Sequence, residues 1–571
     1  MNFLDEDKSW NLLCKNVFGE ESCPLELEEI GKKIANNCKG LPLSIVVIGG
    51  VLANSQRTRE HWEYIAENLI SIVTLDDNER CLKILHMSYN QLSVHVKPCF
   101  LYMGSISEDS KIRVSLLVKL WVAEGFLKPI SGKSSEMIAE EYLKDLIDRN
   151  LILVHKLGSA GNIKFCIVHD LLRDLCIREA QKERFLNVIK LDNISPDTST
   201  HRRICIPPTI KSRDFTSTPV RALQSASLAR SLICDSSEVL PPSLNFRLLR
   251  VLEAVGRRSN YGDFDFLKAI LQLVNSRYLS IGDFLEVPSH YLSSVHLLWN
   301  LQTLIIKRGS CTAPSEIWKM PQLRHVKFFQ LDLPDPPRYH SDDGQDNPIM
   351  RNLQTLLKIK NFKCGEEVVK RIPNIKKLGI LYVNHKKLSR SCLNNLCRLR
   401  KLESLACLFS ILKRPNRSYL LQNLIFPRSL KKLSLQGSRL QWEDMTTMIG
   451  SLPLLQVLKL KFWSVIGPKW ETVEGQFCSL KFLLIQRCDD LEYWTTDSNT
   501  HFPRLEHLVL RYLDKLKEIP PEIGEIPTLQ SIDLDFCSES LVNSARKILD
   551  EQEDLGNVGL QVRVDSPSTT K

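Results

Sequence analysis

The segment Leu430-Lys-Lys-Leu433-Ser-Leu435 spaces its leucines as L-x-x-L-x-L, and the spacing returns in Leu455-Gln-Val-Leu458-Lys-Leu460 and in Leu505-Glu-His-Leu508-Val-Leu510. Further copies, some of them degraded, keep the same phase along the second half of the chain. The copies start at positions 249, 276, 301, 323, 353, 375, 402, 430, 455, 480, 505 and 529. Helices rich in leucine can imitate one or two such matches, but they do not reproduce a period of about 25 residues.

This period predicts a leucine-rich-repeat solenoid over residues 221–555. The second and third leucines of each unit alternate along a short strand, so both point to one face. A single unit cannot bury that face, whereas stacked units bury a continuous core. The intervening residues face outward on a long, preformed surface that suits protein binding and offers no cavity for chemistry. We therefore expect a binding protein, with no catalytic residues, and not an enzyme.

The outward strand positions are the candidate contacts for a protein partner. Those of the last five units are Lys432, Ser434, Gln436, Val457, Lys459, Lys461, Phe482, Leu484, Gln486, His507, Val509, Arg511, Ser531, Asp533 and Asp535. For any one of them, a solvated strand face is the simpler interpretation. The partner-binding residues that we select from this set are Lys432, Lys459, Lys461, Phe482, His507, Arg511, Asp533 and Asp535.

Composition restricts the other classes of function. The 571 residues exceed one core and predict two or three domains, and the net charge of +10 is modest. We find no clustered basic motif and therefore expect no nucleic-acid partner, while peripheral membrane association stays open. The acidic first thirty residues are unlike a secretory signal, and the apolar run from Leu41 to Ala53 is too short to span a bilayer. The 17 cysteines form no C-x-x-C pair, so we expect a cytoplasmic protein with reduced thiols and no metal site.

The first 180 residues have a helical pattern that ends in a hairpin. Helices are predicted from Pro24 to Asn37, from Glu79 to Asn90 and through much of Val114 to Asn150, and Pro42 suits the first turn of a helix. Leu151 to Val154 and Ile163 to Val168 are predicted strands, joined by Gly158-Ser-Ala-Gly161. Asp170 can cap the helix that follows. Helices followed by a hairpin indicate a winged-helix-like module.

Four motifs carry a family resemblance: Gly40-Leu41-Pro42-Leu43, Cys99-Phe100-Leu101-Tyr102, Leu120-Trp121-Val122-Ala123-Glu124-Gly125-Phe126 and Val168-His169-Asp170. In order and approximate spacing they resemble plant nucleotide-binding leucine-rich-repeat immune receptors. The Trp121 segment is similar to the coiled-coil class, and the chain as a whole to the late-blight-resistance-like group of nightshade plants. The resemblance implies an α/β chain with an ARC1-like helical part of a nucleotide-binding (NB-ARC) region in 1–75 and a winged-helix-like ARC2 module in 76–180. A linker over 181–220, the repeats over 221–555 and a disordered tail over 556–571 complete the expected organisation.

The resemblance also implies a nucleotide switch. In that family ADP holds the receptor closed, and exchange for ATP opens it and leads to oligomers, defence signalling and local cell death. The implied cofactor-binding residues are Gly40, Leu41, Pro42, Leu43, His169 and Asp170, with Pro42 near the adenine and His169 on the β-phosphate of ADP. An imidazole N–H near a helix N-terminus is suited to an anion. Without the resemblance, His169 would be interpreted as a residue of the capping region. Val168 replaces the family's commoner methionine but keeps an apolar anchor.

The phosphate-binding loop of such a switch is missing from the sequence. The nearest match to G-x-x-x-x-G-K-[ST] is Gly132-Lys133-Ser134, but the required earlier glycine is Leu127. Asp76-Asp77 follows the Gly40 motif, where the family order does not place the magnesium-binding aspartates. We therefore expect a chain shortened at its N-terminus, without the signalling coiled coil and the phosphate-binding subdomain. Such a chain should not hold ADP or ATP tightly.

Three functions follow from these features. The first is an immune-receptor fragment that recognises a pathogen effector or a guarded host protein through its repeats, which also contact the nucleotide-binding region of the same protein. The second is a complete ADP-binding receptor of which this sequence is a part. The third is a leucine-rich-repeat adaptor, such as a substrate receptor of a ubiquitin ligase, which would need a short helical adaptor-binding box at its N-terminus.

Overall fold

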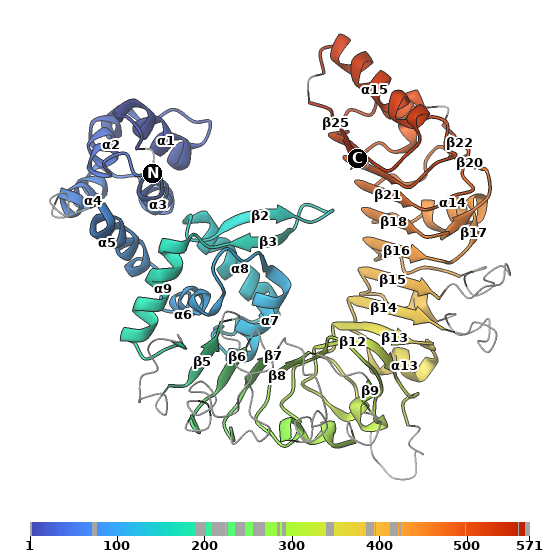
Figure 1. Cartoon of the computed structure of the whole chain (residues 1–571), viewed down its shortest axis with the longest axis horizontal. Coiled ribbons are helices and arrows are strands. Elements are labelled where there is room, and N and C mark those ends of the chain that lie inside the picture. Colours follow the sequence, from blue (N-terminus) through green and yellow to red (C-terminus); the bar gives the residue numbers. More distant parts are fainter. Residues whose placement is uncertain are drawn as a thin grey trace, which may run out of the picture. The chain divides into compact units, whose positions relative to one another are not determined.

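The computed structural model divides the chain into two compact units (Figure 1). The first unit holds residues 1–158, 162–259 and 275–278, and the second holds residues 159–161, 260–274 and 279–571. The residues that the structure describes are 3–70, 77–189, 201–207, 223, 226–234, 246–254, 269–282, 286–287, 293–337, 348–383, 393, 395–410, 421, 424–496, 498–557 and 559–565.

The first unit opens with a helical module made of α1 (Glu6–Phe18), α2 (Leu25–Asn37), α3 (Pro42–Ala53), α4 (Arg59–Ile70) and α5 (Asp77–Asn90). The predictions for α2 and α5 are confirmed. The helices α1 and α4 were not predicted, although each contributes an apolar stripe to the same core, with Leu13 in α1 and Trp62 in α4 fully buried. Asp5 caps α1 by accepting a hydrogen bond from the backbone N–H of Lys8 at 2.8 Å.

A winged-helix module follows, as the sequence predicted. After α6 (Lys97–Leu101) and η1 (Tyr102–Ser105), the helices α7 (Val114–Glu124) and α8 (Ser135–Asp148) precede the hairpin, and α9 (Asp170–Lys182) follows it. The strands β1 (Ile112–Arg113), β2 (Leu153–Leu157) and β3 (Ile163–Ile167) form an antiparallel sheet in the order β1-β3-β2. The strand β2 begins later than predicted because Leu151 and Ile152 are buried and their N–H groups bond the carbonyl of Leu146 at the end of α8.

The parallel sheet of the repeats begins earlier than expected. The strands β4 (Asn187–Val188), β5 (Arg203–Ile206), β6 (Ser231–Cys234) and β7 (Val251–Ala254) pair in this order, so the predicted linker over 181–220 contains two strands. The strand β5 escaped prediction because buried Ile204 and Ile206 take the place of the repeat leucines. Residues 190–200 and 208–220 of that linker lie outside the described residues.

The second unit is a stack of parallel strands in one register. Each of the twelve predicted repeat starts lies two residues before a strand. The first of these strands is β7, which belongs to the first unit, and the next is β8 (Tyr278–Ile281). The later strands are β10 (Thr303–Ile306), β12 (His325–Asp332), β13 (Thr355–Lys360), β14 (Lys377–Tyr382), β15 (Ser404–Phe409), β16 (Lys432–Gln436), β18 (Val457–Lys461), β21 (Phe482–Gln486), β23 (His507–Arg511) and β24 (Ser531–Asp535). The predicted leucine-rich-repeat solenoid is confirmed.

Short elements connect these strands on the other side of each repeat. They are β9 (Glu286–Val287), η4 (Ser293–Leu297), β11 (Ser310–Thr312), η5 (Ser315–Lys319), α13 (Glu366–Arg371), η9 (Leu396–Arg398), β17 (Leu440–Gln441), α14 (Trp442–Gly450), β19 (Val465–Ile466), β20 (Lys469–Glu471), β22 (Tyr493–Thr495), η10 (Asn499–His501), η11 (Pro521–Ile523) and α15 (Glu539–Asp554). Trp470 stacks between Trp442 and Trp494, with ring centroids 4.8 and 4.9 Å away. These stacked indoles fill the space between neighbouring connections.

The tail that was expected to be disordered over 556–571 contains a strand. β25 (Gln561–Asp565) pairs with β24, while residues 558 and 566–571 lie outside the described residues. Within β25, Val562 and Val564 alternate with polar residues, as is typical of a strand with one apolar face. Because β25 pairs with β24, it covers an edge whose backbone groups would otherwise be unpaired.

Candidate functional site

The strand register places the predicted partner-binding residues in three parallel rows. In the first row Lys432, Val457, Phe482, His507 and Ser531 are successive partners on β16, β18, β21, β23 and β24. Lys459 and Asp533 belong to the third-position row, and Lys461, Arg511 and Asp535 to the fifth. Between the rows, Leu433, Leu458 and Leu508 point into the core and are at most 1% exposed. One register therefore fixes both the core and the outward surface of these units.

All eight selected residues are half-buried, and several contact one another. The Lys459 ammonium lies 5.0 Å from the centroid of the Phe482 ring, and the Phe482 and His507 rings are 6.4 Å apart. His507 Nδ1 shares a 3.0 Å hydrogen bond with the Ser531 hydroxyl. Arg511 Nε lies 2.5 Å from Asp535 Oδ2. The wider set needs a correction, because the positions Val457, Leu484, Val509 and Ser531, which were expected to be outward, are buried.

Two charged groups of this surface sit in unfavourable surroundings. Partial burial, and then the Arg511 charge, lower the pKa of Lys461. Burial likewise raises the pKa of the Asp533 carboxyl, and Asp535 adds to the shift against the opposing charges of Arg563, His507 and Arg511. Asp533 Oδ1 is buried without a hydrogen-bond partner among the described residues. Such groups lower the stability of the free protein. A partner that supplies an opposite charge or a hydrogen-bond donor would stabilise them, which favours binding at this surface.

The structure adds a further row that the sequence pattern did not reveal. The residue directly after each of four strands is Phe462, Arg487, Tyr512 or Phe536, and all four have positive φ angles between 45° and 53°. The Arg487 guanidinium lies 5.7 Å from the Phe462 ring centroid and 4.6 Å from that of Tyr512, and the Tyr512 and Phe536 rings stack at 4.9 Å. Left-handed backbone in bulky residues is uncommon and marks positions worth attention. We call these four residues the strand-end row.

The Gly40 motif forms a tight turn into α3. Gly40 has φ +69°, and a Cβ built on it would lie 2.3 Å from the carbonyl oxygen of Leu4. Leu41 is the N-cap residue of α3, and Pro42 is its first residue, as predicted. Neither Pro42 nor Leu43 is fully buried. The motif therefore leaves an apolar helix start partly accessible.

His169 occupies the N-cap of α9, which corrects the prediction that Asp170 caps this helix. The backbone N–H of Leu171 donates to His169 Nδ1 at 3.3 Å, and Asp170 is the first helical residue. Because Nδ1 accepts, the proton of a neutral ring lies on Nε2. Among the described residues no hydrogen bond joins His169 or Asp170 to the Gly40 motif. Whether the two motifs share a nucleotide stays a prediction.

Close packing joins the helical module to the winged helix. A Cβ on Gly50 of α3 would lie 2.5 Å from the Arg149 carbonyl oxygen at the end of α8. Asn54 Nδ2 donates to the Asp148 carbonyl at 3.0 Å, and Asn150 Nδ2 donates to the Val46 carbonyl at 3.0 Å. The near match at Gly132-Lys133-Ser134 has a structural role, because the Ser134 hydroxyl caps α8.

Glu124, within one of the four resemblance motifs, forms a deeply buried ion pair: its side chain is 1% exposed. Its carboxylate accepts from Arg203 Nε at 2.9 Å and from the Ser231 hydroxyl at 2.5 Å. Arg203 also stacks on Phe185, with its guanidinium carbon 4.2 Å from the ring centroid. This cluster fastens α7 to the strands β5 and β6, a role that sequence alone did not reveal because the partners lie 79 and 107 residues away.

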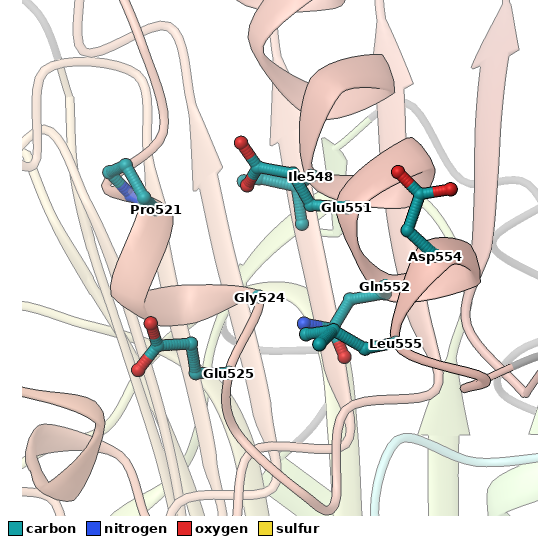
Figure 2. Close-up of a pocket in the computed structure, with 8 residues that line it drawn as sticks. All are labelled: Pro521, Gly524, Glu525, Ile548, Glu551, Gln552, Asp554 and Leu555. Atoms are coloured by element: carbon teal, nitrogen blue, oxygen red, sulfur yellow. The ribbon is translucent and has the colours of Figure 1, made fainter.

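A hollow lies near the C-terminal end of the described residues. Figure 2 shows it between η11 and α15, lined by Pro521, Gly524, Glu525, Ile548, Glu551, Gln552, Asp554 and Leu555. Its three carboxylates lie apart from one another, and Glu551 already pairs with Lys547.

Burial raises the pKa of the Cys407 thiol in β15 to about 12, so that this cysteine is not a thiolate at neutral pH. No described helix has the length and apolar character to cross a bilayer.

Comparisons with known proteins agree with this architecture. Residues 107–176 match the disease resistance protein winged helix domain, and residues 228–554, more than half of the chain, match the leucine-rich repeat region. Two late blight resistance protein homologs of Solanum demissum are each 33% identical to it, over 98% and 97% of the chain. The chain spans 43% and 41% of their lengths. A solved leucine-rich-repeat protein of Leptospira interrogans aligns with 66% of this chain and 99% of its own, at 17% identity and a TM-score of 0.35.

Proposed function

Since the chain belongs to the disease resistance proteins that combine a winged-helix domain with leucine-rich repeats, we propose that it serves immune recognition in the plant cytoplasm. The protein that it recognises is a pathogen effector or a host protein that such an effector modifies. Recognition takes place on the outward strand face of units 430–535, and the protein catalyses no reaction there. The names of the relatives link them to late blight resistance, which supports a role in defence.

One observation supports this site above others: the outward rows combine aromatic anchors with incompletely satisfied charges. Phe482 and His507 supply rings, with Tyr512 of the strand-end row beside them, while Lys461 and Asp533 are half-buried charges whose pKa values are shifted by burial. Aromatic and arginine side chains dominate binding energy at protein interfaces. The core leucines of the same strands hold these side chains at fixed spacing, so little conformational entropy is lost on binding.

We also propose that Gly40 to Leu43 and His169 contribute one wall of an ADP pocket. The accessible start of α3 offers an apolar contact for the adenine, and the His169 Nε2–H is directed by the cap at Nδ1. The sequence contains no G-x-x-x-x-G-K-[ST] segment, so the phosphate contacts of a tight site must come from elsewhere. This chain by itself is expected to bind ADP weakly.

The recognition surface can be tested in leaves that express the protein in its natural full-length context. K459A, F482A and R511A together should abolish the defence response to a pathogen isolate that the wild type detects. The control combines K469A, Y493A and K547A, which also remove two cations and one aromatic ring but lie on β20, β22 and α15. A triple strand variant that still responds like the wild type would contradict the proposal.

The nucleotide role can be separated from the capping role of His169. In H169N the amide oxygen can still accept the Leu171 N–H, whereas the imidazole Nε2–H is lost. In a protein that includes an upstream phosphate-binding loop, H169N should weaken ADP retention without lowering the melting temperature, and H169A should do both. Equal ADP retention in wild type and H169N would assign His169 to the helix cap alone.

A further inference from the structure

Four arginines occupy one position on consecutive strands of the first unit. Arg202, Arg230, Arg250 and Arg277 directly precede β5, β6, β7 and β8. The N–H of Arg230 donates to the carbonyl of Arg202 at 2.7 Å, that of Arg250 to Arg230 at 2.6 Å, and that of Arg277 to Arg250 at 2.8 Å. The backbones of the four arginines therefore lie side by side where these strands start. Arg277 Nη1 would lie 3.3 Å from a Cβ built on Gly125, the residue that directly follows α7. We call them the arginine row.

The arginine row has no ion-pair partner among the described residues, and the buried Glu124 carboxylate is the one acidic group whose charge is felt at Arg230 and Arg250. None of its guanidinium groups forms an ion pair there, and the nearby buried carboxylate of Glu124 is bonded to Arg203 and Ser231. Burial lowers the pKa values of Arg230 and Arg250, and the neighbouring arginines lower them further. Adjacent strands lie about 4.8 Å apart, a spacing at which opposed like charges destabilise a sheet. The single charge of Glu124, which already pairs with Arg203, does not balance four arginines, so this part of the sheet keeps an excess of positive charge.

The same position in the second unit is built differently. Its successive residues are Gln302, Arg324, Gln354, Lys376, Glu403, Lys431, Gln456, Lys481, Glu506 and Gln530. There Lys431 pairs with Glu403 at 3.3 Å, and Lys481 pairs with Glu506 at 2.5 Å. Neutral and acidic residues interrupt the cations, as charge balance within a sheet favours. Only the first unit, within the described part of the chain, repeats a cation on four consecutive strands.

We propose that the arginine row is a binding site for a small organic polyphosphate. Its guanidinium groups are planar forks that match phosphate oxygens in pairs, and all four positions carry arginine where lysine would give a point charge. The row extends over about 14 Å, three strand spacings, which two or three linked phosphates can cover. A phosphate group carries up to about two negative charges, so such a ligand balances the row. An extended peptide places side chains of one face about 6.8 Å apart and delivers fewer charges over this length.

Titration calorimetry of the full chain with sodium tripolyphosphate tests the proposal. The wild type should bind one tripolyphosphate with an affinity that falls steeply as salt is added. R230Q combined with R250Q should weaken binding by about tenfold or more. K376Q, which removes a cation from the equivalent position of the second unit, should leave the affinity within about twofold. A parallel titration with ATP distinguishes two sources of the phosphates. If ATP binds more tightly than tripolyphosphate, the site also contacts the nucleoside. If the two affinities are equal, the phosphate chain alone is recognised.

Thermal unfolding without ligand separates a ligand site from a structural one. R230Q with R250Q relieves repulsion, so its melting temperature should equal or exceed that of the wild type, while the stabilisation by tripolyphosphate should be lost. R230K combined with R250K keeps the positive charge but loses the bidentate hydrogen bonds of the guanidinium groups, so it should bind with intermediate affinity. The proposal is overturned if the wild type binds no tripolyphosphate, if the glutamine variant binds it unchanged, or if hexaglutamate binds more tightly. The site differs from the recognition surface, so either proposal can fail alone.

Discussion

Arg203 Nε lies 2.9 Å from Glu124 Oε2, and this contact joins the end of α7 to the first strands of the repeat sheet. The Glu124 side chain is 1% exposed and that of Arg203 is 16% exposed. The Glu124 carboxylate is thus shielded from water, and it also accepts a hydrogen bond from the Ser231 hydroxyl. Contacts of this kind are costly to break from one side, because the remaining charge stays buried.

Glu124→Ala should therefore destabilise the first unit by about 3–5 kcal/mol, measured by urea unfolding. Its matched control is Glu63→Ala, which removes the partner of Arg59 from a pair whose side chains are 49% and 59% exposed. An exposed pair of this type is worth about 0–1 kcal/mol, so the control should unfold almost like the wild type. Similar losses in both variants would show that burial does not set the strength of the Glu124 contact.

Leu508→Ala should destabilise the second unit by about 2–5 kcal/mol through loss of buried surface and formation of a cavity. Leu508 is 0% exposed and occupies the same core row as Leu458, for which the same loss is expected. Leu454→Ala is the control, because that side chain is 47% exposed. Wild-type-like unfolding of L508A would contradict the assignment of the second leucine of each repeat to the core.

Gly40→Ala tests the tight turn at the start of α3. Gly40 and Gly132 both have positive φ, +69° and +79°, but nothing lies within 4 Å of a Cβ built on Gly132. Gly132→Ala should cost about 1–2 kcal/mol through backbone strain alone. Gly40→Ala adds the clash with the Leu4 carbonyl and should cost about 2–5 kcal/mol. Equal losses in the two variants, measured by differential scanning calorimetry, would exclude the close approach of Leu4.

Asp533→Asn should stabilise the protein in a pH-dependent way. The folded-state pKa of Asp533 is raised above 3.8, so the folded protein loses stability as the pH rises through that pKa and the half-buried carboxylate ionises. The asparagine variant should gain about 1 kcal/mol at pH 7, the low end for an unsatisfied polar group, and nothing below about pH 3.8. Asp535→Asn breaks the pair with Arg511 and should bring no gain. A pH-independent effect of D533N would refute this origin.

The sequence predicted the repeat phase well because leucine spacing is a local property. Every strand from Val251 to Asp535 that belongs to the twelve units begins two residues after a predicted start. The winged helix was also predictable, since helical and strand periods differ within a short stretch. The helices α1 and α4 were missed because their apolar stripes are short and are flanked by charged residues that are themselves part of a solvated helix face.

Features that depend on stacking could not be read in the same way. Arg202 and Arg277 stand 75 positions apart in the chain, so no local window contains a basic cluster, although the sheet aligns them with Arg230 and Arg250. The strand-end row has the same origin, because Phe462 and Arg487 become neighbours only when the repeats stack. For His169, the position in the capping region of α9 could be predicted from the local sequence. The proposed contact of His169 with a nucleotide could not, because it depends on residues outside this helix.

The shared two-residue offset between repeat start and strand has an evolutionary consequence. Since every unit enters the sheet in the same phase, recombination that adds, deletes or exchanges a whole unit leaves each core leucine pointing inward. Only the outward-facing residues of that unit change, together with its contacts to the two neighbouring repeats. The exchange of one unit can thus change one patch of the outward surface while the core of the solenoid stays the same.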